Sequence, residues 1–332
     1  MVYFGYEYSS CAPEFFDNYK KNIIRNADGS LRGGWQRFPQ QKAYIVCYKS
    51  GYSDVFLERC RNAMENYGVD GIYTDGTYIP LSCSNAEHGC GYTDKSGIRH
   101  ETWPLRSVRE HVKKLYIQTH KFGGIIEAHQ SGCVVSMILA YCDSYYDGEQ
   151  IALKTDPVTG FVSSISSEEL IEKFTGKADS GIDTVRAEFT GVNFGIPCQF
   201  LSYCSDYNES CGLTLLYGVL QKPTGDFPNI EKASYHWKIM DKFRLSQQDF
   251  IPFWRDDCPV KCTNNDLFCS VWKVDTGYVA VIAKFVSESI QSKFVFEFSC
   301  EQIIDLRSNM PLIGNEISLD NSAPIYLLFK TK

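Results

Sequence analysis

The sequence has no cluster of lysines and arginines, and its 40 acidic residues outnumber its 33 basic ones, giving a formal net charge of −7. This balance argues against nucleic acid or an anionic membrane surface as a partner. No apolar run approaches the roughly 18 residues of a membrane span. The N-terminal stretch "MVYFGYEYSS" lacks the basic region and apolar core of a signal peptide and reads as the inside of a folded element. We therefore expect the chain to be part of a longer multidomain protein.

A dense disulfide framework is also absent, although the chain has 14 cysteines in 332 residues. Several of them lie in apolar runs, where a thiol acts as a small hydrophobic side chain: Cys47, Cys60, Cys142 and Cys198. Free thiols suit a reducing compartment and equally an exported protein of an anaerobe, so no localisation is predicted. Aromatic residues are abundant at 14%. Most will pack in cores, but rings also stack on the flat apolar faces of sugars.

Up to about residue 250, short apolar segments alternate with helical ones, which predicts parallel βαβ units. We expect helices at 53–67, ended by Gly68, at 103–121, with Pro104 in its first turn, and at 167–174. The expected strands are 2–6, 43–48, 71–75, 124–129, 144–149, 184–189 and 199–203. Seven such strands favour a (β/α)8 TIM-type barrel, whose eighth strand is either poorly marked in the sequence or lies upstream of it. No G-x-G-x-x-G motif follows the first strand, so dinucleotide binding has no support.

The pattern changes beyond "DFIPFW", residues 249–254. Segments such as "LFCSVWKV" and "GYVAVIAKF" show partial alternation and are separated by turn residues, which predicts a small antiparallel β-sandwich. The predicted domains are therefore a barrel over 1–250 and a β-sandwich over 251–332.

Four successive barrel strands are predicted to end in acidic residues. The acids and their neighbours are Asp75, then Glu127 with His129, then Asp147 with Glu149, then Arg186 with Glu188. Catalytic residues of (β/α)8 barrels lie at the C-terminal ends of strands. Burying a carboxylate in an apolar barrel interior costs free energy, so a carboxylate there without a function is not expected. One acid in such a place is ordinary, but four in a row favour a functional site.

Paired carboxyls are what glycoside hydrolysis requires. Asp75 could act as nucleophile or stabiliser, with Glu149 as general acid/base across the barrel mouth. In the alternative, substrate-assisted route, Glu149 is the acid and Asp147 holds an acetamido group of the substrate. The spacing of the residues does not choose between these routes. His129 could contact ligand or be a core histidine bonded to a backbone carbonyl.

The loop at 77–97 holds Cys83, His88 and Cys90. A zinc site is conceivable there, but the C-x4-H-x-C spacing is not a standard one and no fourth ligand is evident. The prediction is an ordered active-site loop whose Tyr78 and His88 contact ligand or neighbouring loops. No metal and no cofactor are predicted.

The segments "GVDGIYTDGTYIPLSCSNAEHGCGY", "GIIEAHQSG" and "CDSYYDGEQ" together resemble bacterial barrel proteins related to the glycoside hydrolase family 123 β-N-acetylgalactosaminidase group. More distantly, the layout is similar to the retaining α-galactosidase and α-N-acetylgalactosaminidase clan. The close resemblance covers about residues 1–250, and the β-sandwich is generic. Family 123 enzymes use an adjacent Asp–Glu pair, whereas this chain has Asp147-Gly148-Glu149.

The resemblance implies a glycoside hydrolase that acts on a galactose-type or N-acetylhexosamine-type sugar of an oligosaccharide or glycoconjugate. The predicted catalytic residues are Asp75, Glu149 and Asp147. The predicted substrate-binding residues are Tyr73, Tyr78, His88, Glu127, His129, Arg186 and Glu188. The alternative function is a non-catalytic carbohydrate-binding module on a degenerate barrel.

Overall fold

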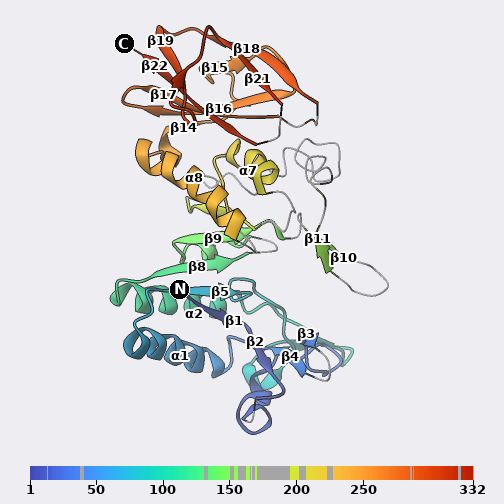
Figure 1. Cartoon of the computed structure of the whole chain (residues 1–332). Helices are drawn as coiled ribbons and strands as arrows, with labels where there is room; N and C mark the ends of the chain where they lie inside the picture. Colours follow the sequence, from blue (N-terminus) through green and yellow to red (C-terminus); the bar gives the residue numbers. More distant parts are fainter. Residues whose placement is uncertain are drawn as a thin grey trace. The chain divides into compact units, whose positions relative to one another are not determined.

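The computed structural model describes residues 1–12, 14–37, 41–130, 134–149, 153–155, 162–164, 166, 169, 195–201, 207–222, 227–284, 286, 288–320 and 323–331. The chain forms two compact units, Met1–Tyr146 and Asp147–Lys332. Figure 1 colours the first unit from blue to green and the second from green to red. Among the described residues, no helix combines the length and the apolar character that crossing a membrane requires.

The first unit contains a parallel sheet, two small antiparallel sheets and two long helices (Figure 1). Its strands are β1 (Val2–Gly5), β2 (Glu7–Ser9), β3 (Gly33–Arg37), β4 (Gln41–Ile45), β5 (Gly71–Asp75), β6 (Tyr92–Thr93), β7 (Arg99–His100), β8 (Ile125–His129) and β9 (Ser144–Asp147). Its helices are α1 (Tyr52–Tyr67), α2 (Leu105–Lys121) and α3 (Ser136–Leu139), with the short turns η1 (Phe15–Tyr19), η2 (Lys20–Asn22) and η3 (Ala86–His88).

Both long helices of the first unit confirm the sequence prediction. α1 starts one residue before the predicted 53–67 segment and ends at Gly68, whose φ of 62° lies in the left-handed region that favours glycine. α2 begins directly after Pro104, two residues inside the predicted 103–121 segment. Local sequence signals therefore mark one end of each helix, Gly68 at the end of α1 and Pro104 at the start of α2.

The parallel sheet of the first unit is built by β1, β5, β8 and β9, paired in that order. One of its faces is apolar, and the buried residues on it are Ile72, Ile126, Ala128 and Tyr145. α1 packs on this face through Phe56, whose ring lies 5.6 Å from that of Phe4 in β1. Side chains alternate along each strand, so the opposite face carries the other set of residues.

The prediction that residues 43–48 form a strand of the parallel barrel sheet was wrong. β4 occupies this part of the chain and pairs antiparallel with β2 and β3, while β1 pairs directly with β5. Only residues 38–40 separate β3 from β4. A parallel pair needs a crossover of a dozen or more residues, so this short connection allows a hairpin instead.

The second unit has short parallel strands and helices followed by antiparallel sheets (Figure 1). Its helices are α7 (Tyr207–Leu215) and α8 (Phe227–Phe243), with the turn η4 (Gln247–Asp249). Its strands are β10 (Leu153–Thr155), β11 (Val162–Ser164), β12 (Cys198–Phe200), β13 (Leu220–Gln221), β14 (Phe250–Ile251), β15 (Val260–Cys262), β16 (Leu267–Val274), β17 (Gly277–Lys284), β18 (Ile290–Phe296), β19 (Cys300–Asp305), β20 (Met310–Pro311), β21 (Glu316–Leu319) and β22 (Ile325–Thr331).

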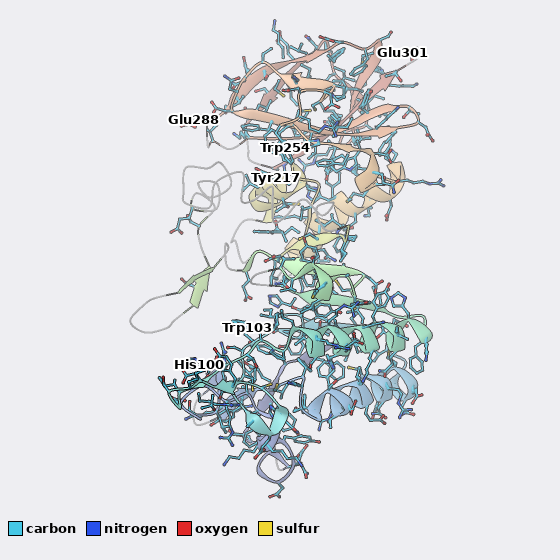
Figure 2. All side chains as sticks on the ribbon, turned by 180° about the vertical axis from the view of Figure 1, so that it is seen from behind. His100, Trp103, Tyr217, Trp254, Glu288 and Glu301 are labelled. Carbon is cyan, nitrogen blue, oxygen red and sulfur yellow. The ribbon has the colours of Figure 1, made fainter. Side chains whose placement is uncertain are left out.

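The C-terminal strands form two antiparallel sheets, with orders β14-β16-β17-β22-β19-β20 and β15-β18-β21. Both contribute to one apolar core, in which the rings of Phe294 and Phe329 meet edge to face at 5.3 Å. The segment before β14 packs on these sheets, since the hydroxyl of Ser270 in β16 donates to the carbonyl of Leu216 at 2.7 Å. Tyr217 and Trp254, labelled in Figure 2, place their ring centroids 5.0 Å apart.

The described residues thus show an α/β part followed by an antiparallel β part. Two predicted elements lie outside the described residues, namely the strand at 184–189 and, apart from Glu169, the helix at 167–174. The predicted boundary at residue 250 stays a prediction.

Candidate active site

The polar face of the parallel sheet in the first unit carries two rows of side chains near the C-terminal strand ends. Strand register aligns Tyr3, Tyr73, Glu127 and Ser144 in one row, and Gly5, Asp75, His129 and Tyr146 in the next. Parallel strands place their carboxyl ends at one edge, which is where α/β proteins bind ligands. The sheet therefore gathers two predicted acids, a histidine and three tyrosines in one place.

Asp75 is the most accessible acid of this group, with 32% of its side chain exposed. Its Oδ2 accepts a hydrogen bond from the hydroxyl of Tyr3 at 2.7 Å, and its Oδ1 lies 3.3 Å from His129 Nδ1. Burial and the hydrogen bond to Asp75 raise the pKa of Tyr3 well above its ordinary value. Tyr3 therefore stays protonated and remains a donor to the carboxylate across the pH range in which proteins work.

His129 lies between Asp75 and a second tyrosine. The hydroxyl of Tyr73 is 2.9 Å from His129 Nδ1, and the two rings stack with an interplanar angle of 19°. Burial, followed by the charge of Asp75, raises the pKa of Tyr73. The side chain of His129 is only 9% exposed, and both Asp75 and Tyr73 contact its Nδ1. This geometry favours a positioning role for His129 toward the Asp75 carboxylate.

Glu127 is buried and lies two residues before His129 in β8, on the same face of the sheet. Its Oε1 accepts from the Ser144 hydroxyl at 3.2 Å. Burial, and then the charge of Glu127, raises the pKa of Tyr146. Glu127 therefore lies beneath the rim of the site, next to the residues that line it, and its predicted role in substrate binding stays a prediction.

The division between the two units falls inside β9, between Tyr146 and Asp147, so Asp147 and Glu149 are counted in the second unit. Strand β9 ends at Asp147, which is buried and whose Oδ1 accepts from the backbone N–H of Gly148 at 2.7 Å. Gly148 has a φ of 109°, which turns the chain out of the strand. The alternation that predicted a shared face for the two acids therefore does not reach Glu149. Glu149 itself is half-buried.

The glycine between these acids is required by its surroundings. A Cβ at position 148 would lie 2.4 Å from Cε2 of Phe200, and the φ of 109° strains any other residue. We expect Gly148→Ala to lower the free energy of unfolding by at least about 2 kcal/mol, through strain and overpacking. Denaturant titration measures this loss.

Gly195→Ala is the matched control for this substitution. Gly195 also has a positive φ, of 69°, but no atom lies within 4 Å of a Cβ placed there. Gly195→Ala should therefore lower the free energy of unfolding only by the backbone strain, about 1 kcal/mol. Equal losses in the two variants would show that Phe200 does not restrict position 148.

The other predicted site residues do not join the Asp75 group. Tyr78 is buried and its hydroxyl donates to the carbonyl of Tyr141, which favours a packing role. His88 lies in a cysteine cluster in the loop after β5. Arg186 and Glu188 lie outside the described residues. Trp103, labelled in Figure 2, has 60% of its surface exposed.

Sequence reasoning missed Tyr3 and Tyr146, although both belong to the polar face. Tyr3 lies in the first apolar run, where the alternation V-Y-F-G placed it opposite Phe4. The sequence of this strand does not show that Tyr3 belongs to the site. Only the strand register does so, because the pairing of Tyr3 with Tyr73 brings it beside Asp75. Tyr146 follows the same rule through its pairing with His129.

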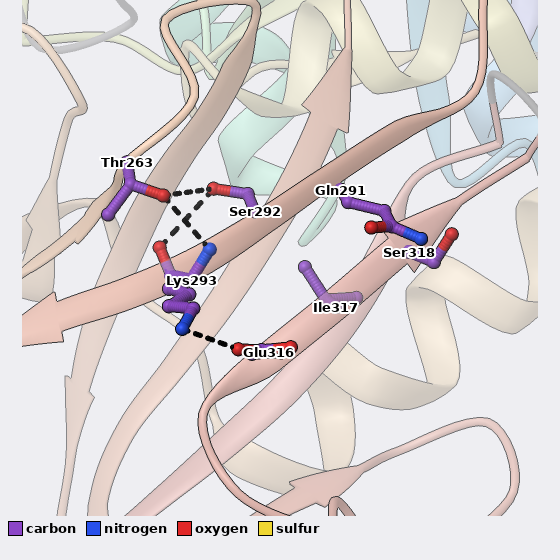
Figure 3. A pocket seen from close by; sticks show the side chains of 7 residues that line it. All are labelled: Thr263, Gln291, Ser292, Lys293, Glu316, Ile317 and Ser318. Carbon is purple, nitrogen blue, oxygen red and sulfur yellow. Dashed lines mark hydrogen bonds and ion pairs between the residues drawn. The ribbon is translucent and has the colours of Figure 1, made fainter.

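A shallow polar hollow lies on the sheet β15-β18-β21 of the second unit (Figure 3). Its lining residues are Thr263, Gln291, Ser292, Lys293, Glu316, Ile317 and Ser318. Its single carboxylate, Glu316, is exposed and paired with Lys293 at 2.7 Å. Glycoside hydrolysis generally uses two carboxyls, one of them with a raised pKa, so this hollow does not match that chemistry.

Comparison with solved structures shows a fold similar to that of alpha-amylases. Three solved structures that are similar to this chain are a noncanonic maltogenic alpha-amylase from Thermotoga neapolitana (TM-score 0.56, 10% identity, covering 96% of this chain and 74% of that one), an alpha-amylase from Geobacillus thermoleovorans (TM-score 0.56, 8% identity, 100% and 77%) and an alpha-amylase from H. orenii (TM-score 0.51, 8% identity, 98% and 79%). At these identities the likeness concerns the fold. No curated protein sequence matches the chain significantly.

A family match falls in the second unit. Residues 232–310 match the C-terminal domain of glycoside hydrolase 123. The match lies in the β-rich region, which sequence reasoning had treated as generic. It confirms the predicted relation to the family 123 group and supports the prediction of an O-glycosyl hydrolase. Over residues 232–310, the chain is thus similar to the C-terminal domain of glycoside hydrolase 123.

Proposed function

We propose that the protein is a glycoside hydrolase whose substrate binds at the C-terminal ends of β5 and β8. The observation that carries this proposal is the Asp75 carboxylate, which is partly open to solvent yet held by Tyr3 and His129. A carboxylate fixed in this way could attack an anomeric carbon or stabilise positive charge on it. The family match over residues 232–310 and the amylase-like fold support the same class of reaction.

The rings around Asp75 fit a carbohydrate. Tyr73 and Tyr146 meet edge to face with centroids 5.6 Å apart, and Tyr3 and Tyr73 lie 5.5 Å apart. Aromatic side chains of this kind combine an apolar surface with a polar tip, as sugars do. The preference for a galactose-type or N-acetylhexosamine-type sugar rests on the sequence resemblance alone.

The roles of Glu149 and Asp147 are proposals that rest on the sequence. Glu149 would protonate the leaving oxygen as the general acid. In a substrate-assisted reaction, Asp147 would orient the acetamido group of the substrate. Glu149→Gln tests this assignment, because turnover of an aryl glycoside with a good leaving group should survive better than turnover of a natural oligosaccharide, which needs the acid more.

The complete barrel is likewise a proposal. The fold likeness to alpha-amylases over 96% or more of the chain supports a (β/α)8 arrangement over 1–250 and a β-sandwich over 251–332. An experimental structure with strands from residues 150–206 completing the sheet would confirm it.

A screen of aryl α- and β-glycosides tests the function directly. Hydrolysis of at least one substrate, with NMR identification of the first anomer released, would establish both the reaction and its stereochemistry. The alternative is a non-catalytic carbohydrate-binding module. Saturable oligosaccharide binding without turnover would favour that alternative and overturn the proposal.

Tyr3→Phe is expected to lower kcat/KM by about tenfold, because a hydrogen bond to a charged group contributes about 1.5 kcal/mol and 1.4 kcal/mol corresponds to a factor of ten. The measurement is steady-state kinetics on the best substrate of the screen. Tyr67→Phe is the matched control, since Tyr67 ends α1 with 76% of its surface exposed. If Tyr3→Phe retains wild-type kcat/KM, then Tyr3 does not hold the reacting carboxylate.

A further inference from the structure

Four metal-ligating side chains that do not belong to the Asp75 group meet in the first unit. They are Cys47, Cys83, His88 and Cys90, and their ligand atoms all lie within 4.8 Å of one another. Cys47 follows strand β4, whereas the other three come from the loop between β5 and β6. The fourth ligand that the loop sequence lacked is therefore supplied by a distant part of the chain.

We propose that these four side chains bind a structural Zn²⁺ ion in a Cys3His site. The Sγ atoms of Cys47 and Cys90 are 3.9 Å apart, and Cys83 Sγ lies 3.8 Å from His88 Nδ1. Tetrahedral zinc, with Zn–S near 2.3 Å and Zn–N near 2.0 Å, places its ligand atoms about 3.5–3.8 Å apart. The two distances above lie within a few tenths of an ångström of this spacing, and all four ligand atoms lie within 4.8 Å of one another.

The surroundings of His88 prepare it as a ligand. Its Nε2 lies 2.7 Å from the carbonyl of Lys21 and 3.2 Å from the amide nitrogen of Asn85, and the closer contact, to an acceptor, favours a proton on Nε2. A proton on Nε2 leaves the lone pair of the neutral ring on Nδ1, the atom that faces Cys83. Metal-binding histidines almost always donate their second ring nitrogen to an acceptor of this kind. This fixed tautomer points to a metal rather than to the substrate contact predicted for His88.

The backbone around the cluster also suits thiolates. The N–H of Asn85 donates to Cys83 Sγ at 3.4 Å. Three thiolates and Zn²⁺ carry a net charge of about −1. Two cations flank the loop, since Lys49 donates to the carbonyl of Gly89 and Arg99 donates to that of Cys90.

Simple packing accounts for this cluster less well. The three cysteines do contact Ile24 and Ile45 in a small apolar core. A purely apolar core would not direct an imidazole nitrogen toward its sulfurs, nor a backbone N–H. A disulfide would bring two sulfurs to about 2.05 Å, far closer than the 3.9 Å observed between Cys47 and Cys90.

The site would be structural, because four protein ligands leave no open position for water or substrate. It would join the end of β4 to the loop after β5, two segments that are also held together by the small apolar core and by the hydrogen bond from Lys49 to the carbonyl of Gly89. Part of the free energy of metal binding would therefore stabilise the first unit.

Metal analysis of the purified full chain tests the proposal. After expression with zinc and purification without chelators, mass spectrometry should find about one zinc per chain. Cys47→Ser and Cys83→Ser should lose this zinc. Cys60→Ser is the matched control, because Cys60 is a buried free thiol of α1 that lies outside the cluster, and it should keep the metal.

A cobalt experiment covers the case in which the serine variants fail to fold. Co²⁺-loaded wild type should show thiolate-to-metal charge transfer and visible bands of a tetrahedral ion. His88→Cys supplies a fourth thiolate, so it should keep the metal and absorb more strongly in the charge-transfer region. Wild-type protein without zinc, an ion other than zinc, equal metal loss in Cys60→Ser, or an unchanged cobalt spectrum in His88→Cys would each overturn the proposal.

Discussion

Asp75→Asn is expected to lower kcat on an aryl glycoside by a factor on the order of 10³ or more, with little change in Tm. The asparagine keeps the size of the side chain, can still accept from Tyr3, and loses only the charge that stabilises or attacks the anomeric carbon. A factor of 10³ corresponds to about 4 kcal/mol of transition-state stabilisation, which is the usual scale for one preorganised electrostatic group. Because Asp75 is partly exposed, its neutral replacement should cost the fold little.

Asp70→Asn is the control for this experiment. Asp70 is exposed and precedes the same strand, so it lies at the opposite end of β5 from Asp75. Its substitution should leave kcat and Tm unchanged. Turnover retained in Asp75→Asn would remove Asp75 from the reaction, and the glycosidase proposal would then rest on the family match alone.

A smaller side chain separates two roles of Asp75. In Asp75→Ala, an added small anion such as azide could occupy the vacated space. If Asp75 is the nucleophile, azide should restore turnover and yield a glycosyl azide. If Asp75 only stabilises charge, for example in a substrate-assisted reaction, azide should not attack the anomeric carbon in place of Asp75. No glycosyl azide should then form.

The helices of the first unit were predictable because their signals are local. Gly68 and Pro104 mark helix ends whatever the rest of the chain does. Strand partners depend on chain segments far apart in sequence. The apolar run at 43–48 looked like its neighbours, yet β4 pairs antiparallel and leaves the parallel sheet. Alternation shows that a strand exists, but not which strand lies beside it.

The same limit applies to the two sites. Asp75 and His129 were predicted because both end a strand, and parallel pairing places them opposite each other. Tyr3 was missed because only register brings it to Asp75. Cys47 was taken for a packing residue because the sequence shows ligand spacing within one loop and not across the fold.

The burial of His111 is a feature that the helical periodicity of the sequence does predict. His111 lies on α2 between Val108 and Val112, which belong to the buried stripe of the helix, so its burial follows from helical periodicity. Its ring stacks on Tyr48 at 4.1 Å and meets the edge of Phe56 at 5.1 Å. Ser53 Oγ is 2.8 Å from Nδ1, whereas Nε2 is buried without a hydrogen-bond partner.

Acid should therefore destabilise the first unit through His111. Burial, followed by the charge of Lys114, lowers the pKa of His111 from 6.5 to about 3. Between about pH 3 and pH 6.5, His111 binds a proton in the unfolded chain but not in the folded chain. The free energy of unfolding therefore falls as the pH drops below about 6.5. At 1.36 kcal/mol per pH unit, the loss between pH 7 and pH 4 is of the order of 3 kcal/mol. Stability above pH 6.5 should not change through this group.

His111→Phe should remove this part of the pH dependence. Phenylalanine fills a similar volume between Tyr48 and Phe56 and cannot bind a proton, while Ser53, which is half-buried, can turn to water. Denaturant titrations at pH 7 and pH 4, with hydrogen exchange of the α1 and α2 amides as the local probe, should show a smaller loss in the variant. His120→Phe is the control, because it removes an imidazole of the same helix that is 39% exposed and should leave most of the pH dependence in place. If wild type and His111→Phe lose the same stability in acid, then His111 is not the buried base that the acid must protonate.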